Sequence, residues 1–145
     1  MDAELKIQLH SFEEIEVGHA ASIEVYLSKA AVFQFADLTG DHNPLHVDED
    51  YARSTQFEKN ICHGMLVSSY VSTLVGMILP GKRCLVLSSS FDYLLPVFHS
   101  DIVVVAGLVK EKTPSQHSLG IDVKIFREID TVIDGYVRVK VLDEH

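Results

Sequence analysis

Residues 35–52 read FADLTGDHNPLHVDEDYA, and this stretch is the most informative part of the chain. Pro44 removes a backbone donor and disfavours a helical conformation at Asn43, so the segment is neither a regular helix nor a regular strand. Asp41 and His46 therefore stand five residues apart on a stiff, polar loop. A carboxylate and an imidazole placed in this way can form an acid–base pair. An N-capping aspartate and a surface histidine in an ordinary Asn-Pro turn would explain the same residues.

The segment resembles, position by position, the hydratase signature of the MaoC-like hot-dog proteins, which include the (R)-specific enoyl-CoA hydratases. Further landmarks of that family follow in the same order and spacing, so that the resemblance covers roughly residues 12–142: Tyr51-Ala52, Thr55, Phe57, Ile61 to Leu66, Leu79-Pro80-Gly81, Leu95 to Phe98 and Asp101. One departure is visible, because Ser100, preceded by His99, stands where the family usually has glycine. This turn lies far in sequence from the signature, so we expect it to affect a hairpin rather than the chemistry.

Length, composition and charge fit a single domain over residues 1–145. The chain has 145 residues, of which 47% are apolar and 23% charged, as in ordinary globular proteins. The net charge of −9 disfavours nucleic acids and anionic membrane surfaces, since both attract basic proteins. Residues 64–79 are apolar but too short to span a bilayer. With no apparent signal or transit peptide, we expect a cytoplasmic protein that neither binds nucleic acid nor inserts into membranes.

The spacing of apolar residues indicates an α+β fold. Residues 63–79 predict one long, nearly all-apolar helix that Pro80-Gly81 stops. A shorter helix between Ser28 and Gly40, and a further turn begun by Asp48, are expected before it. The chain then becomes rich in β-forming residues, in four runs at 84–95, 101–112, 117–128 and 131–142. We expect these runs to form a four-strand antiparallel meander curved around the long helix.

The resemblance adds details that periodicity does not supply. It implies the hot-dog fold, with a first strand near residues 17–27 that joins the sheet. In that fold two subunits commonly join their sheets edge to edge, which also covers an open strand edge. A homodimer or a higher homo-oligomer is therefore expected.

The resemblance also implies a reaction, the addition of water to a 2-enoyl thioester to give an (R)-3-hydroxyacyl product, or the reverse dehydration. Asp41 and His46 match the family's catalytic pair, and the sequence does not decide which of them is the base. Gly64, at the start of the long helix, matches the residue whose N–H forms the oxyanion hole. A glycine that merely begins the helix is the alternative for this position.

Three further residues are candidate parts of the site. Asn43 can orient the pair or bind the water, although it is also a good turn former. Ser72 aligns with a family serine near the catalytic carboxylate, but a serine bonded back into its own helix fits equally well. Val75, one turn farther, is expected at the end of an acyl pocket for short to medium chains. His63 is interpreted as a packing or loop-bonding residue and not as a second acid or base.

The remaining reactive residues indicate neither a metal nor a cofactor. The eight histidines show no ligand spacing, and Cys62 and Cys84 stand in apolar surroundings typical of structural burial. The substrate is expected to be a thioester of CoA or of acyl-carrier protein.

Four functions compete on this sequence. An (R)-specific enoyl-CoA hydratase, serving β-oxidation or polyhydroxyalkanoate supply, fits best. An (R)-3-hydroxyacyl-[acyl-carrier-protein] dehydratase shares its site chemistry, so that the sequence does not choose between them. Hot-dog thioesterases generally carry a carboxylate on the long helix, and residues 64–79 contain none. A non-catalytic acyl-thioester-binding protein would be expected to lose the Asp/His pair, which this chain retains.

Overall fold

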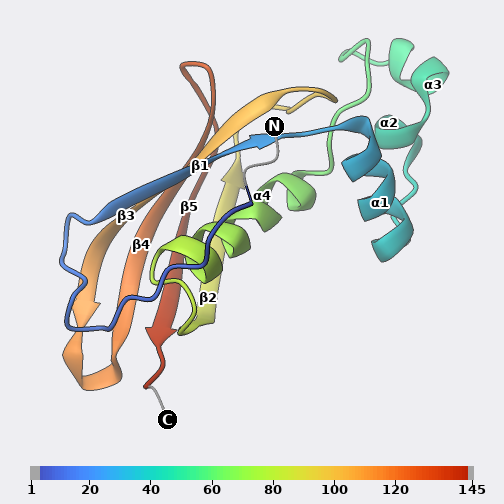
Figure 1. The fold of residues 1–145 in the computed structure, drawn as a ribbon. Coiled ribbons are helices and arrows are strands. Elements are labelled where there is room, and N and C mark those ends of the chain that lie inside the picture. The colour runs from blue at the N-terminus through green and yellow to red at the C-terminus, as the bar shows by residue number, and fades with distance from the viewer. Residues whose placement is uncertain (1–3, 144–145) are drawn as a thin grey trace.

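The computed structural model describes residues 4–143, in which a five-stranded antiparallel sheet curves around one helix (Figure 1). The order of the strands across the sheet is β1-β3-β4-β5-β2. This arrangement confirms the predicted α+β class, and each strand begins and ends within three residues of its predicted run or region: β1 (Ala20–Tyr26), β2 (Cys84–Tyr93), β3 (Ile102–Thr113), β4 (Ser118–Arg127) and β5 (Asp130–Val141).

The predicted four-strand meander was wrong in its first strand. Strand β2 pairs with β5 and not with β3, so only β3, β4 and β5 form a meander. The connection from β2 to β3 leaves the sheet between these two strands. Along it Phe98 forms a bridge with Ile61, and the Ser100 N–H donates to the carbonyl of Leu27, just after β1. Alternation of apolar residues identifies a strand but says nothing about its neighbour in the sheet.

The long helix lies against the inner face of the sheet. It begins as α4 (Gly64–Thr73) and continues as a π-helical turn, η1 (Leu74–Ile78), so the predicted helix is present with a wider last turn. Every second residue of β3 from Val103 faces the core. At Gly107 a Cβ atom would lie 2.9 Å from Leu74 Cδ2, so the glycine lets the helix approach the sheet closely.

Three short helices gather at one end of the sheet (Figure 1): α1 (Lys29–Thr39), α2 (Pro44–Val47) and α3 (Glu49–Arg53). Their ends confirm the predicted caps. The Ser28 hydroxyl accepts a hydrogen bond from the Ala31 N–H, and Gly40 ends α1 with a φ of 82°. The Asp48 carboxylate accepts from the Tyr51 N–H at the start of α3. These caps fix the loop between α1 and α2 at both of its ends.

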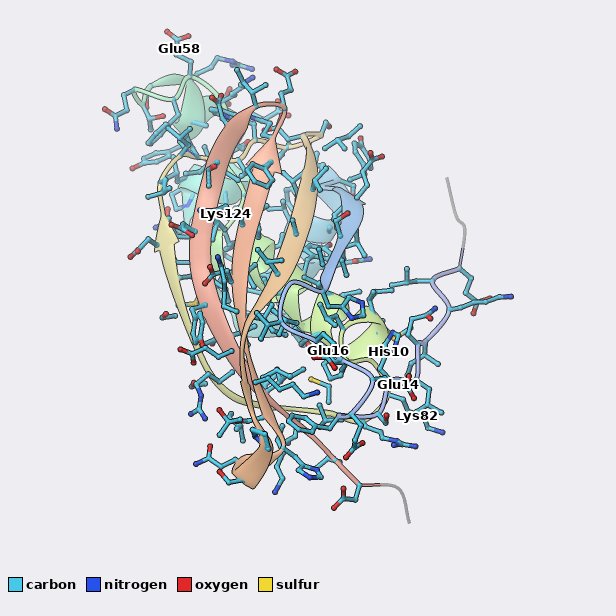
Figure 2. The ribbon with its side chains drawn as sticks, turned by 90° about the vertical axis from the view of Figure 1, so that its left-hand side faces the viewer. His10, Glu14, Glu16, Glu58, Lys82 and Lys124 are labelled. Carbon is cyan, nitrogen blue, oxygen red and sulfur yellow. The ribbon has the colours of Figure 1, made fainter. Side chains whose placement is uncertain are left out.

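The N-terminal segment, residues 4–19, crosses the helix on the side that the sheet leaves open (Figure 1). Phe12 and Ile15 from this segment are buried in the core, and the Gln8 N–H donates to the carbonyl of Met77. The sheet covers the opposite side of the helix, and its outer face carries polar pairs such as Lys124 and Asp134 (Figure 2). Within residues 4–143, no helix has the length and apolar character needed to cross a membrane.

The turn before β3 is not a β-hairpin, because β2 pairs with β5 while β3 pairs with β1 and β4, and Ser100 stands in this turn in place of the usual glycine. Ser100 has a φ of 72°, in the left-handed region that favours glycine. Its N–H bonds to the carbonyl of Leu27, and Asp101 Oδ2 accepts from the Phe98 N–H at 2.9 Å and from Arg127 Nη1 at 3.1 Å. The contacts around the turn therefore hold a serine in a conformation that it does not favour.

We expect Ser100→Gly to raise the free energy of unfolding by about 0.5 to 1 kcal/mol, because relief of the left-handed strain exceeds the entropy that glycine adds to the unfolded chain. Urea unfolding of the two proteins measures the difference. Ser100→Ala is the matched control, since alanine keeps the strain and should bring no gain. A glycine variant no more stable than the wild type would contradict the assignment.

Candidate active site

The loop between α1 and α2 places Asp41 by means of its own backbone. Asp41 Oδ1 accepts a hydrogen bond from the Asn43 N–H at 3.1 Å, and the Asp41 N–H donates to Thr39 Oγ1 at 3.2 Å. The Asn43 side chain in turn accepts from the Leu45 N–H at 3.0 Å, as the N-cap of α2. The Asp41 side chain remains 51% exposed. Its carboxylate is thus oriented at one oxygen and open to solvent or a ligand at the other.

His46 lies on α2 with one ring nitrogen committed to the protein. Its Nδ1 is 2.9 Å from the carbonyl oxygen of Ile61. Because a carbonyl can only accept, Nδ1 carries the proton, and in the neutral ring Nε2 is left as a free lone pair. Burial lowers the pKa of His46, and the nearby His63 lowers it further, while the bond to Ile61 and the charge of Asp41 act in the opposite direction. The ring is therefore poised to accept a proton at Nε2.

The side chain of His63 contacts both Asp41 and His46. Its side chain is 3% exposed, and its Nε2 donates to the backbone carbonyl of Asp41 at 3.0 Å. The His63 ring stacks on the ring of His46 with centroids 4.0 Å apart and planes 29° apart. Its Nδ1 is buried and has no hydrogen-bond partner among the described residues. This confirms the predicted packing and loop-bonding role.

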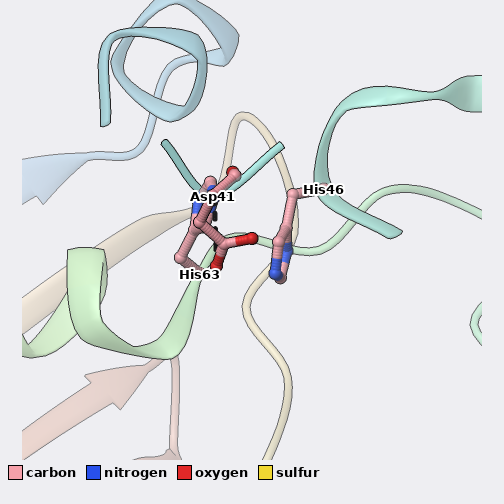
Figure 3. Close-up of side chains that lie close together, drawn as sticks. All are labelled: Asp41, His46 and His63. Carbon is pink, nitrogen blue, oxygen red and sulfur yellow. Dashed lines mark hydrogen bonds and ion pairs between the residues drawn. The ribbon is translucent and has the colours of Figure 1, made fainter. Parts of the chain in front are cut away.

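The three side chains converge at the start of α4 (Figure 3). Asp41, His46, His63 and Gly64 line one cavity of about 390 Å³, with Phe35 and Tyr93 among the residues that complete it. We call it the catalytic cavity. The His63 side chain does not cap α4, so no described side chain covers the N–H groups of the first turn in this way. An imidazole lone pair, a carboxylate and the positive end of a helix thus border one space.

The structure brings together Asp41, His46 and Gly64, keeps Asn43 beside Asp41, and places Ser72 and Val75 at a different cavity. The Asn43 amide caps α2, and the residue supports Asp41 through its backbone N–H instead. Ser72 and Val75 line a different cavity, of about 200 Å³, whose lining includes neither Asp41 nor His46. We call this second space the helix cavity. The role proposed for Ser72 beside the pair stays a prediction without a contact to support it.

Two residues that the sequence did not mark as functional hold residues 40–48 in place, a segment that we call the catalytic loop. His99 Nε2 donates to the carbonyl of His46 at 2.9 Å, so the turn at residues 98–101 touches the site. The expectation that this departure concerned only a hairpin was wrong, because the fold brings the turn back to the signature. Asn60 Nδ2 lies within 3.3 Å of the carbonyls of Pro44, Leu45 and Asp48. Its position just before the recognised motif was the only signal for it.

The reactive groups near the pair could serve as metal ligands or as a nucleophile. Asp41, His46 and His63 each offer a possible metal-ligand atom, all within 4.8 Å of one another. However, His46 Nδ1 and His63 Nε2 already donate to carbonyls, which leaves one nitrogen on each ring. The absence of a metal stays a prediction. Burial, and secondarily the charge of Asp101, raises the pKa of Cys62 to about 12, so its thiol is no nucleophile.

Several known proteins resemble this chain in sequence and in fold. An (R)-specific enoyl-CoA hydratase of Rhodospirillum rubrum is 41% identical over 108 residues, covering 72% of this chain and 75% of the relative. The solved R-hydratase PhaJ1 from Pseudomonas aeruginosa superposes with a TM-score of 0.91 at 30% identity, covering 95% of this chain and 89% of that one. An (R)-hydratase from A. caviae involved in PHA biosynthesis gives a TM-score of 0.87 at 35% identity, over 90% and 99% of the two chains. These likenesses confirm the hot-dog fold. The sequence model of the MaoC-like domain family matches residues 12–125, and the chain belongs to the MaoC-like family.

Proposed function

We propose that this protein adds water to trans-2-enoyl-CoA to give (R)-3-hydroxyacyl-CoA, and catalyses the reverse dehydration. The observation that carries the proposal is the free Nε2 of His46 in one cavity with the Asp41 carboxylate and Gly64. The relatives named as (R)-hydratases support the same reaction and its stereochemistry.

The arrangement suggests how one water molecule is used. Asp41 accepts a hydrogen bond from the water and orients it, while His46 Nε2 takes the water's other hydrogen as a proton when the oxygen attacks C3, so that the first hydrogen stays on the new hydroxyl group. The imidazolium formed in this step then returns its proton to C2 on the same face of the substrate. The Asp41 carboxylate stabilises the imidazolium between these steps, so the two groups act as a coupled pair. Every atom of the water ends in the product.

Negative charge develops on the thioester oxygen during this addition, and Gly64 is placed to stabilise it. Its N–H belongs to the first turn of α4, where the helix dipole favours an anion. For the acyl chain we propose the helix cavity, where Val75 forms part of the wall.

Asp41→Asn and His46→Ala should each lower kcat for hydration of crotonyl-CoA about 10²- to 10⁴-fold, because each removes one proton-transfer group. The loss of enoyl absorbance measures hydration, and chiral analysis of the product tests the (R) configuration. His42→Ala is the control, since the ring of this neighbouring histidine is exposed and lies beside Asp37 on the surface. Circular dichroism establishes that the variants are folded.

Near-normal turnover in either variant would overturn the assignment of the pair. Release of free thiol by the wild type, in place of hydration, would identify a thioesterase. No reaction with crotonyl-CoA or with longer enoyl-CoAs would refute the proposed function itself.

The role of His46 as the base also predicts a tautomer. Nitrogen NMR should find neutral His46 protonated at Nδ1 and neutral His63 protonated at Nε2, because each donates to a backbone carbonyl. The pKa of His46 should lie below 6.5, so that the hydration rate falls only as the pH drops below that value. His46 protonated at Nε2 when neutral would remove the base from the cavity.

We infer further that two copies of the chain associate through the edge formed by β2. Leu85, Val86 and Leu87 lie on this edge strand and are 48%, 47% and 45% exposed. A long edge strand with three consecutive exposed apolar residues is prone to pair with another strand. Pairing of two β2 strands would continue the sheet from one subunit into the next.

Light scattering after size exclusion should therefore give twice the mass of the chain for the wild type, or a larger multiple. The double change Leu85→Lys and Leu87→Lys should yield monomers, because charges on the edge oppose strand pairing. Tyr26→Lys on β1, at the opposite edge, is the matched control and should leave the mass unchanged. A wild-type monomer would contradict the inference.

A further inference from the structure

Tyr93 stands where two cavities meet. One is the catalytic cavity, and the other is an apolar space of about 300 Å³ that we call the side cavity. His46, Gly64 and Tyr93 belong to the lining of both. Apolar side chains supply most of the remaining wall of the side cavity, among them Phe57, Ile61, Val67, Leu95, Val97 and Ile133. The reaction proposed above uses the catalytic cavity and leaves the side cavity without a role.

Two contacts hold the Tyr93 ring in this place. Its hydroxyl lies 2.9 Å from Ser68 Oγ, and Ser68 itself donates to the carbonyl of Met65 at 3.2 Å. A serine has one proton, so Ser68 accepts from the tyrosine. The ring also lies against the backbone of Gly64, because a Cβ atom there would be 2.9 Å from Cδ1 and Cε1 of the ring. Glycine at this position therefore makes room for the tyrosine ring.

The ring is fixed but not part of the core. Tyr93 is 48% exposed, whereas its partner Ser68 is buried. The residue ends β2, opposite Ile133 of β5, and its loss interrupts no strand. A substitution at this position is thus expected to change the cavities while the fold persists.

We propose that Tyr93 is a specificity-determining residue whose ring separates the catalytic cavity from the side cavity and keeps the acyl chain of the substrate out of the latter. The inference rests on the proposed hydration of enoyl thioesters. In the wild type the acyl chain is then limited to the helix cavity, which at about 200 Å³ is smaller than the side cavity of about 300 Å³. Ser68 positions the ring and also borders the helix cavity. The hydrogen bond between Ser68 and Tyr93 therefore links a wall of the helix cavity to a wall of the side cavity.

Removal of the ring should open the side cavity to long, linear acyl chains. For Tyr93→Ala we expect the ratio of kcat/KM for dodecenoyl-CoA to kcat/KM for crotonyl-CoA to rise about tenfold or more, since each methylene that is newly buried contributes roughly fourfold. Tyr93→Phe keeps the ring and loses only the bond to Ser68, so its ratio should stay within about threefold of the wild type. Tyr26→Ala, a half-exposed tyrosine on β1 that lines none of these three cavities, is the matched control.

Binding of saturated dodecanoyl-CoA, measured by calorimetry, gives a readout that requires no turnover. Tyr93→Ala should bind it about tenfold more tightly than the wild type does, whereas Tyr93→Phe and Tyr26→Ala should not. An unchanged ratio and unchanged binding in Tyr93→Ala would overturn the role of the ring and leave the hydratase assignment intact. If the wild type hydrates no enoyl-CoA, the proposed function fails, and the binding comparison still decides the role of Tyr93.

Discussion

The hydrogen bond from His46 Nδ1 to the carbonyl of Ile61 is the interaction on which the site depends. It spans fifteen residues of sequence and joins the catalytic loop to the strand-like segment that leads into α4. It also assigns the proton of the ring to Nδ1 and turns the Nε2 lone pair to the cavity. Position and protonation of the base are thus set by one contact.

The contacts around this bond make it rigid. His63, two residues after Ile61, returns a hydrogen bond to the carbonyl of Asp41, so the same short segment holds both members of the pair. Asn60 and His99 donate hydrogen bonds to backbone carbonyls of the loop, Asn60 to that of Leu45 and His99 to that of His46. Because these side chains bond to the backbone of the loop, the side chains of Asp41 and His46 are held in position and stay available to a ligand. Such preorganisation favours the proposed proton transfer.

Gly64, at the start of α4, borders both the catalytic cavity and the ring of Tyr93. Gly64 offers an N–H at the positive end of the helix and, because it has no side chain, leaves space on its other side for the ring of Tyr93. In the proposed reaction, stabilisation of the thioester oxygen and selection of the acyl chain would therefore meet at Gly64. Under this proposal Tyr93, which touches no reacting atom, would still control which substrates fit.

The sequence by itself determined the α+β class and the caps at Ser28, Gly40 and Asp48, because these features are local and follow from spacing and residue type. That Asp41 and His46 lie together was expected only from the resemblance to the MaoC-like family, since spacing alone left an ordinary turn as the alternative. Only the tertiary structure decided that β2 pairs with β5, that Ser72 stands apart from the catalytic pair, and that His99 and Tyr93 reach the site. Such contacts join residues far apart in the chain, and they exist only after the sheet has curved around the helix, which no short-range pattern encodes.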